Sequence, residues 1–174
     1  MKRLSFVMAV MSLFIFANPV SASLSFTDTK TWNSPYEFND SFSYTHSLSL
    51  SPLAANLDSA SLSIKYSRAN TGEQWSVVSL YAAPELKIGD LKTQNNQGFS
   101  TQAFTLSSNI LTQIKNAGWN LTIELREGTS GADNLKISES IFSGTYTPVP
   151  VPAALWLLGS GLIGLIAIRR RNKH

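Results

Sequence analysis

The chain has no cysteine among its 174 residues and only two histidines, His46 and His174. The missing thiols exclude disulfides, thiolate metal sites and cysteine nucleophiles. His46 is the only histidine in the long middle stretch, so histidine-based acid–base catalysis has little material there. Its alternation with Tyr44 and Leu48 predicts that it lies on the packed face of a strand rather than in a catalytic triad.

Charge is also scarce, because charged residues make up 14% of the chain, and the basic excess is confined to its ends. The terminal basic residues are Lys2, Arg3, Arg169, Arg170, Arg171 and Lys173. Without these six of the 14 basic residues, 8 remain against 11 acidic ones, so residues 23–147 carry a formal charge of 8 − 11 = −3. A basic surface for phosphate backbones is therefore missing from this stretch, and we expect no nucleic-acid partner.

Common catalytic motifs are missing as well. The sequence contains no G-x-S-x-G, no H-E-x-x-H and no phosphate-binding loop with lysine. Residues 159–164 match G-x-G-x-x-G, but no strand precedes them and no acidic partner follows, so we interpret them as small residues of an apolar helix. Glu124 and Glu127 are expected on opposite faces of a strand. We therefore expect no enzyme, with a carboxylate-based hydrolase as the least favoured alternative.

The N-terminus has the three-part layout of a secretory signal peptide. Two basic residues precede an apolar run over residues 4–17, and Pro19 breaks that run. Small residues follow, which predicts cleavage between Ala22 and Ser23 after export by a Sec-type machinery. An uncleaved N-terminal anchor is the alternative.

The C-terminal tail, residues 148–174, combines three parts. A proline-rich segment comes first, then an uncharged stretch over residues 153–168, then a basic cluster over residues 169–173. The uncharged stretch would span roughly 24 Å as a helix, which is short for a bilayer core of about 30 Å. We still predict a transmembrane helix, with the basic cluster cytoplasmic and the preceding domain outside.

The order of these parts in residues 149–171 resembles a PEP-CTERM sorting signal. The resemblance implies export from a Gram-negative bacterium, an inner-membrane anchored precursor, and recognition by an exosortase that cuts near the proline motif. It also implies delivery to the cell surface or extracellular matrix, with exopolysaccharide or biofilm as the surroundings. Val149 stands where the name-giving glutamate would be, so the tail is similar to a VPxPA-type variant. The residues that carry the resemblance are Pro148, Val149, Pro150, Val151, Pro152, Arg169, Arg170 and Arg171. An ordinary membrane anchor that stays uncut is the alternative.

Residues 23–147 read as one exported all-β domain. Period-two alternation or β-rich composition predicts strands over residues 44–50, 60–66, 75–81, 99–106, 119–125 and around 135–137. A helix is predicted over residues 108–117, stopped by Gly118. Short strands separated by turn signals indicate an antiparallel β-sandwich, jelly-roll-like, with one short helix.

Two ligand hypotheses remain for this domain. Asp133 and Asn134 lie in a glycine-rich loop and could supply oxygen ligands to Ca²⁺, although a solvated loop is favoured and we expect no cofactor. An aromatic cluster consists of Trp32, Tyr36, Phe38, Phe42 and Tyr44, and Trp32 and Tyr36 are its candidate glycan contacts. The alternative is that the cluster fills the core or covers an edge. The favoured function is a non-catalytic envelope or matrix protein, and the alternative is a glycan- or exopolysaccharide-binding module.

Overall fold

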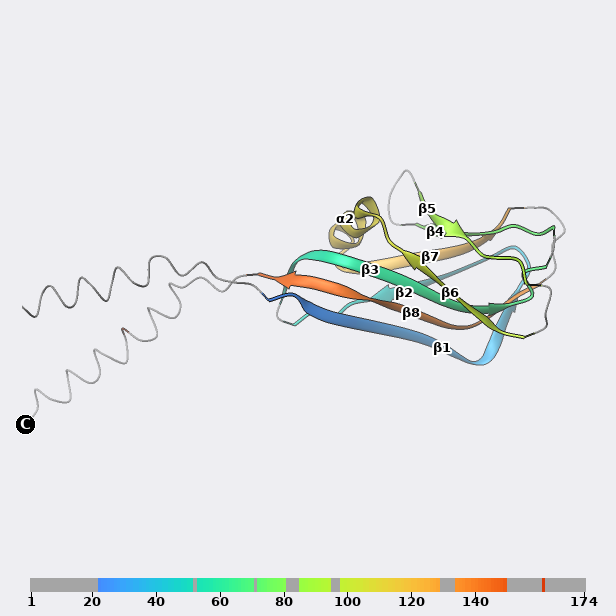
Figure 1. Ribbon diagram of the computed structural model, residues 1–174, viewed down its shortest axis with the longest axis horizontal. Helices are drawn as coiled ribbons and strands as arrows, with labels where there is room; N and C mark the ends of the chain where they lie inside the picture. The colour runs from blue at the N-terminus through green and yellow to red at the C-terminus, as the bar shows by residue number, and fades with distance from the viewer. Residues whose placement is uncertain are drawn as a thin grey trace, which may run out of the picture. The chain divides into compact units, whose positions relative to one another are not determined.

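The computed structural model describes residues 22–51, 53–70, 72–80, 85–94, 98–128, 134–149 and 161. Ser23–Pro148 form one compact unit of two four-stranded antiparallel sheets packed as a sandwich, with one short helix (Figure 1). Within these ranges no helix is long and apolar enough to cross a membrane. The membrane helix expected at residues 153–168 lies outside the described residues, apart from Gly161.

The first sheet contains the longest strands and has the order β1-β8-β3-β6. Its members are β1 (Leu24–Phe38), β8 (Leu135–Pro148), β3 (Ala54–Ser67) and β6 (Ser100–Thr105). Leu24 pairs with Tyr146, so the start of β1 and the end of β8 lie side by side at one end of the sheet (Figure 1). Both ends of the compact unit therefore leave from the same place.

The second sheet has the order β2-β7-β4-β5. Its strands are β2 (Ser41–Ser47), β7 (Asn120–Glu127), β4 (Trp75–Ser79) and β5 (Leu86–Asp90). Along β7, Leu121, Ile123 and Leu125 are all fully buried, as period two requires of a strand with one face on the core. Together with Trp75 they pack against the inner face of the first sheet.

The single described helix of the domain, α2 (Ser108–Asn116), is amphipathic. Ile110 and Ile114 are one turn apart and buried, which holds the helix on the sandwich. Gly118 follows with a φ of 65°, a left-handed conformation that favours glycine and ends the helix. The expected helix over residues 108–117 is thus confirmed to within one residue at its end.

β-Bulges interrupt the alternation along the long strands. In β3 the pairing steps from Leu57↔Tyr146 to Ser59↔Thr145, which leaves Asp58 as an extra residue. In β8 the pairing with β3 steps from Ile137↔Tyr66 to Glu139↔Lys65, which leaves Ser138 as an extra residue. Each bulge reverses which positions face the core from there onward.

Other strand boundaries depart from the sequence-based expectations. β2 ends at Ser47, although Leu48 still donates its backbone N–H to the Trp119 carbonyl. β4 ends at Ser79, and Tyr81 lies outside the described residues. β1 and β5 were not predicted as strands, because the outward-facing polar positions of β1 dominate its composition and β5 has only 5 residues.

Candidate functional site

A polar network of Asp28, His46, Ser140 and Tyr44 connects the two sheets, and its central residues His46 and Ser140 are fully buried. His46 Nδ1 lies 2.7 Å from Asp28 Oδ2, and His46 Nε2 lies 2.9 Å from Ser140 Oγ. The Tyr44 hydroxyl donates to Ser140 Oγ at 2.9 Å. Since Ser140 Oγ accepts the hydrogen bond from Tyr44, the Ser140 hydroxyl donates its own hydrogen to His46 Nε2. The His46 Nδ1–H then donates to Asp28. Each of these four side chains therefore has at least one hydrogen-bond partner within the network.

This is the atomic order of a serine–histidine–aspartate triad, and the sequence-based expectation for His46 missed it. His46 does lie on the packed face as predicted, with an exposed fraction of 0%. Ser140 also has an exposed fraction of 0%, so a substrate carbonyl has no approach to its oxygen in this structure. A nucleophile must come within about 3–3.5 Å of the atom it attacks. In this structure the four side chains link β1 and β8 of one sheet to β2 of the other.

The electrostatics of the network agree with a neutral imidazole. Burial lowers the pKa of His46 below its ordinary value, while the hydrogen bond that His46 donates to Asp28 opposes that change. Burial also raises the pKa of the Tyr44 hydroxyl. Both groups thus stay uncharged at neutral pH, which suits a low-dielectric site between two sheets.

The predicted aromatic cluster lies beside this network, where edge strands β1 and β2 meet. The register between β1 and β8 shifts between Thr31 and Tyr36. Trp32 lies in this interval and packs edge-on against Phe42 and Tyr44, with ring centroids 5.8 and 5.4 Å apart. The Tyr36 ring lies 4.5 Å from that of Phe42, and Tyr36 is 47% exposed. Trp32 is half-buried, so it covers the edge of the sandwich. Of the two predicted glycan contacts, Tyr36 presents the larger free surface.

The two predicted calcium ligands are not seen together. Asp133 lies outside the described residues, and the Asn134 side-chain N–H₂ donates to Glu37 Oε1 at 3.0 Å. This hydrogen bond, together with Lys136, lowers the pKa of Glu37. In the part of the chain that the structure describes, no group of three or more acidic or histidine side chains could hold a metal ion.

The residues around the predicted cleavage sites lie at the end of the sandwich where β1 begins and β8 ends. Ala22 and Ser23 are exposed and precede β1. Pro148 ends β8 opposite Ala54, and Val149 is 47% exposed. The other sorting residues, Pro150, Val151, Pro152, Arg169, Arg170 and Arg171, lie outside the described residues.

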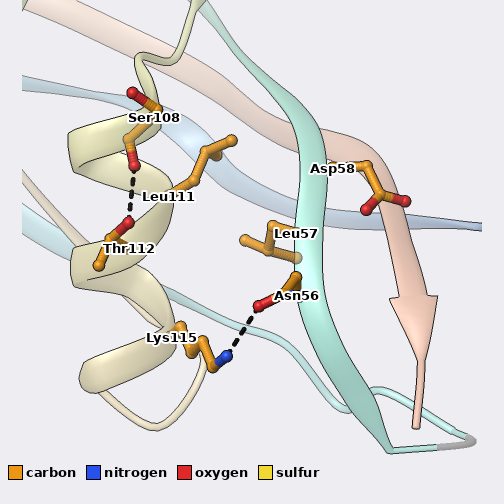
Figure 2. Close-up of a pocket in the computed structure, with 7 residues that line it drawn as sticks. All are labelled: Asn56, Leu57, Asp58, Ser108, Leu111, Thr112 and Lys115. Carbon is orange, nitrogen blue, oxygen red and sulfur yellow. Dashed lines mark hydrogen bonds between the residues drawn. The ribbon is translucent and has the colours of Figure 1, made fainter. Parts of the chain in front are cut away.

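A groove of about 240 Å³ lies at the same end, between α2 and β3 (Figure 2). Lys115 of α2 crosses it to donate to Asn56 Oδ1 at 2.7 Å. In Figure 2 the Asp58 side chain leaves β3 on the side away from α2. There its carboxylate accepts hydrogen bonds from Ser23 Oγ at 2.8 Å and from Thr147 Oγ1 at 2.9 Å. We call Ser23, Asp58 and Thr147 the terminal clasp.

The chain therefore passes from a paired strand straight into the tail at Pro148. Residues 148–171 match the family model of the PEP-CTERM protein-sorting motif. They are a PEP-CTERM sorting motif. A PEP-CTERM motif implies a protein that is exported and sorted by an exosortase, with a membrane-anchoring C-terminal tail, typically in Gram-negative bacteria. The match begins at the last residue of β8, so the PEP-CTERM motif and the folded domain adjoin directly.

The domain in front of the PEP-CTERM motif has weaker likenesses. It is similar to dimeric latent PorU from Porphyromonas gingivalis, with 8% identity and a TM-score of 0.43, over 75% of this chain but only 14% of that one. It is also similar to the coat protein of Tobacco streak virus in two crystal structures. These have 9% identity and TM-scores of 0.34 and 0.35, and the matches cover 78% of this chain and 93% and 92% of those. No curated protein matches the sequence.

Three residues of the network and the clasp were not singled out from the sequence, namely Asp28, Ser140 and Asp58. A signal for Ser140 was present, because the apolar positions of β8 change from odd numbers, Leu135 and Ile137, to even ones, Phe142 and Tyr146. Such a change of parity marks a bulge between them. Asp58 has a similar signal in β3, where Leu57 and Ala60 are both buried although three positions apart.

Proposed function

We propose that the chain is a non-catalytic exported protein of the cell envelope or extracellular matrix, sorted and processed by an exosortase through residues 148–174. The observation that carries this proposal is the PEP-CTERM motif placed directly at the end of β8. The proposed precursor has a signal peptide at residues 1–22, a β domain at residues 23–147 and an inner-membrane anchored tail. Exosortase action then moves the domain to the surface or the matrix.

Within the β domain, the strand orders β1-β8-β3-β6 and β2-β7-β4-β5 support a jelly roll. Consecutive strands mostly alternate between the sheets, and the first and last strands are neighbours. A non-catalytic role is supported by the closed site around Ser140. The carboxylates of Glu124 and Glu85 both bind Arg126, which makes them an ion-pair network rather than the facing acid and base of a hydrolase.

The test is the intact mass of the protein from the envelope and the medium of its native host. We expect a species that begins at Ser23 and ends between Pro148 and Pro152, alone or with an added group. A species that begins at Ser23 but still ends at His174 would refute exosortase processing and leave an ordinary anchor.

Tail variants sharpen this test. The double variant Pro150→Ala, Pro152→Ala should accumulate as a membrane-retained precursor, and replacing Arg169, Arg170 and Arg171 with glutamate should disturb topology or retention. Pro35→Ala is a matched control, because it removes an exposed proline from β1 and leaves the tail intact. If the tail variants were processed like Pro35→Ala, the sorting motif would not direct processing.

A glycan-binding module of the cell surface is the second candidate, and the exposed Tyr36 ring favours it. The ring is held against Phe42, and a rigid flat face suits stacking on sugar rings. Tyr36→Ala should weaken retention on the host exopolysaccharide in affinity electrophoresis, whereas Phe99→Ala should not, since Phe99 is a 39% exposed aromatic residue outside the aromatic cluster. Equal retention of parent and both variants would count against a glycan site at Tyr36.

A further inference from the structure

The position of Asp58 in β3 follows from a β-bulge. Leu57 and Ser59 each pair with β8, at Tyr146 and Thr145, and Asp58 is the extra residue between them. A bulge bends the strand and re-aims the side chain of the residue it inserts. Here it leaves the Asp58 carboxylate at the place where β1 starts and β8 ends.

Both oxygens of this carboxylate are engaged by residues next to the two chain ends of the domain. Ser23 Oγ donates to Oδ2, and Thr147 Oγ1 lies 2.9 Å from Oδ1 and 3.0 Å from Oδ2. Ser23 is the first residue after the proposed cleavage site, and Thr147 immediately precedes the PEP-CTERM motif. A single side chain on β3 therefore holds the beginning of the domain and its exit to the tail.

We propose that Asp58 is the binding site for the α-ammonium group that signal-peptide cleavage creates on Ser23, which rests on the cleavage in the proposed function. In that cleavage, water adds across the Ala22–Ser23 peptide bond under the action of a signal peptidase. The products are a carboxylate on Ala22 and a protonated amine on Ser23. The nitrogen and Oγ of Ser23 are joined through Cα and Cβ, so a carboxylate that contacts Oγ has the new ammonium group within reach.

Among the described residues, Asp58 forms no ion pair with a basic side chain. Lys115 of α2 lines the groove between α2 and β3, but its Nζ donates to Asn56. Tyr146 of β8 is another neighbouring titratable group, and its hydroxyl donates to the Ser51 carbonyl. Ser23 itself is uncharged while a peptide bond occupies its nitrogen, so the attraction appears only after the signal peptide is removed.

The consequence is that cleavage at one end strengthens a contact at the other. Thr147 shares the Asp58 carboxylate with Ser23, and Tyr146 beside it pairs with both Leu24 and Leu57. An ammonium group on Ser23 adds charge to this junction and holds the three strands together where the tail leaves. The cleaved chain thus presents the PEP-CTERM motif from a firmer strand end than the uncleaved precursor.

The experiment measures the melting temperature of the chain from Ser23 to His174 in detergent micelles. Four species are compared, namely the parent and Asp58→Asn, each with a free or an Nα-acetylated Ser23. Acetylation should lower the melting temperature of the parent by about 2 °C and have less than half that effect in Asp58→Asn. Asp40→Asn is the matched control, because Asp40 is an exposed carboxylate just beyond the other end of β1, and it should keep the full effect of acetylation. Ser23→Ala, which keeps the amine and loses only the hydroxyl, should also keep it.

The pH dependence separates a charge effect from a steric one. An ammonium group bound to a carboxylate has a raised pKa in the folded chain. Its stabilisation is therefore fully present below the ordinary α-amino pKa of about 8 and is lost as the pH rises through the raised pKa. The difference between free and acetylated chains should therefore shrink between pH 7 and pH 10.

Two results would be decisive against this inference. Equal effects of acetylation in the parent and in Asp58→Asn would overturn the ammonium site, whatever happens in the cell. Retention of residues 1–22 in the native protein would instead overturn the proposed cleavage and leave no ammonium group for Asp58 to bind. The two failures are read from different measurements, melting temperature and intact mass.

Discussion

The buried network and the terminal clasp are built alike but lie in different surroundings. Each joins a carboxylate to hydroxyl groups across strands, and each depends on a bulge, at Ser138 for the network and at Asp58 for the clasp. Ser140 and His46 are fully buried, whereas Asp58 is exposed. A buried group that loses its partner has no water to replace it, and an exposed one does. We therefore expect the network to contribute more to the free energy of unfolding than the clasp. The exposed contacts of the clasp can change when the chain is processed.

The largest loss of stability is expected at Gly144 of β8, which lies between Ser140 of the network and Thr147 of the clasp. A Cβ atom there would be 2.8 Å from Ala60 Cα and 2.9 Å from Phe26 Cζ, and it would overlap the Ser59 carbonyl. Gly144→Ala should lower the free energy of unfolding by about 3 kcal/mol or more, measured by urea denaturation. Gly98→Ala is the control, since a Cβ there meets nothing within 4 Å. Equal stability of the two variants would mean that β3 and β8 are not so close.

Within the network, Ser140→Ala should cost about 1–3 kcal/mol of unfolding free energy. It leaves His46 Nε2 and the Tyr44 hydroxyl without their shared partner in a site closed to water. Ser143→Ala on the same strand is the matched control, because Ser143 lies among the half-buried positions facing away from the core. Similar losses in both variants would contradict the assignment of Ser140 as the centre of the network.

The pH dependence of stability should also single out the network. Because the pKa of His46 in the folded chain lies below its ordinary value of 6.5, the unfolded chain binds more protons in the window just below pH 6.5. Unfolding free energy should thus fall as the pH falls through that window. His46→Gln should abolish this fall. Glu37 and Asp90, whose pKa values are lowered, lose their contributions at lower pH, below about 4.5. A parent whose stability is flat from pH 7 to pH 5.5 would contradict a neutral buried His46.

The smallest effect is expected at the clasp. Thr147→Val removes one hydroxyl from the exposed Asp58 carboxylate and should cost roughly 0.5 kcal/mol or less. Thr27→Val on β1 is the control, because Thr27 is an exposed threonine of the same sheet that lies away from Asp58. A loss at Thr147 as large as that at Ser140 would erase the distinction between the two sites.

The sequence allowed the class of fold to be predicted, but not the sites. Strict alternation, as in Leu121 and Ile123 of β7, survives folding because the strand is regular and one face meets the core. Asp28 and Ser140 are far apart in sequence, and a bulge sets the side to which Ser140 points, so local periodicity could not bring them together. The sorting motif needed no tertiary contacts, because its composition and order are local.

β8 lies between β1 and β3 and is hydrogen-bonded to both along most of its 14 residues. The PEP-CTERM motif starts at its last residue, so tension on the tail reaches an inner strand first, and the component along that strand loads the hydrogen bonds on both of its sides. Such a load is shared by many backbone hydrogen bonds in shear, instead of peeling them one at a time as it would from an edge strand. A domain built this way is suited to bear mechanical force at the point where it is tethered.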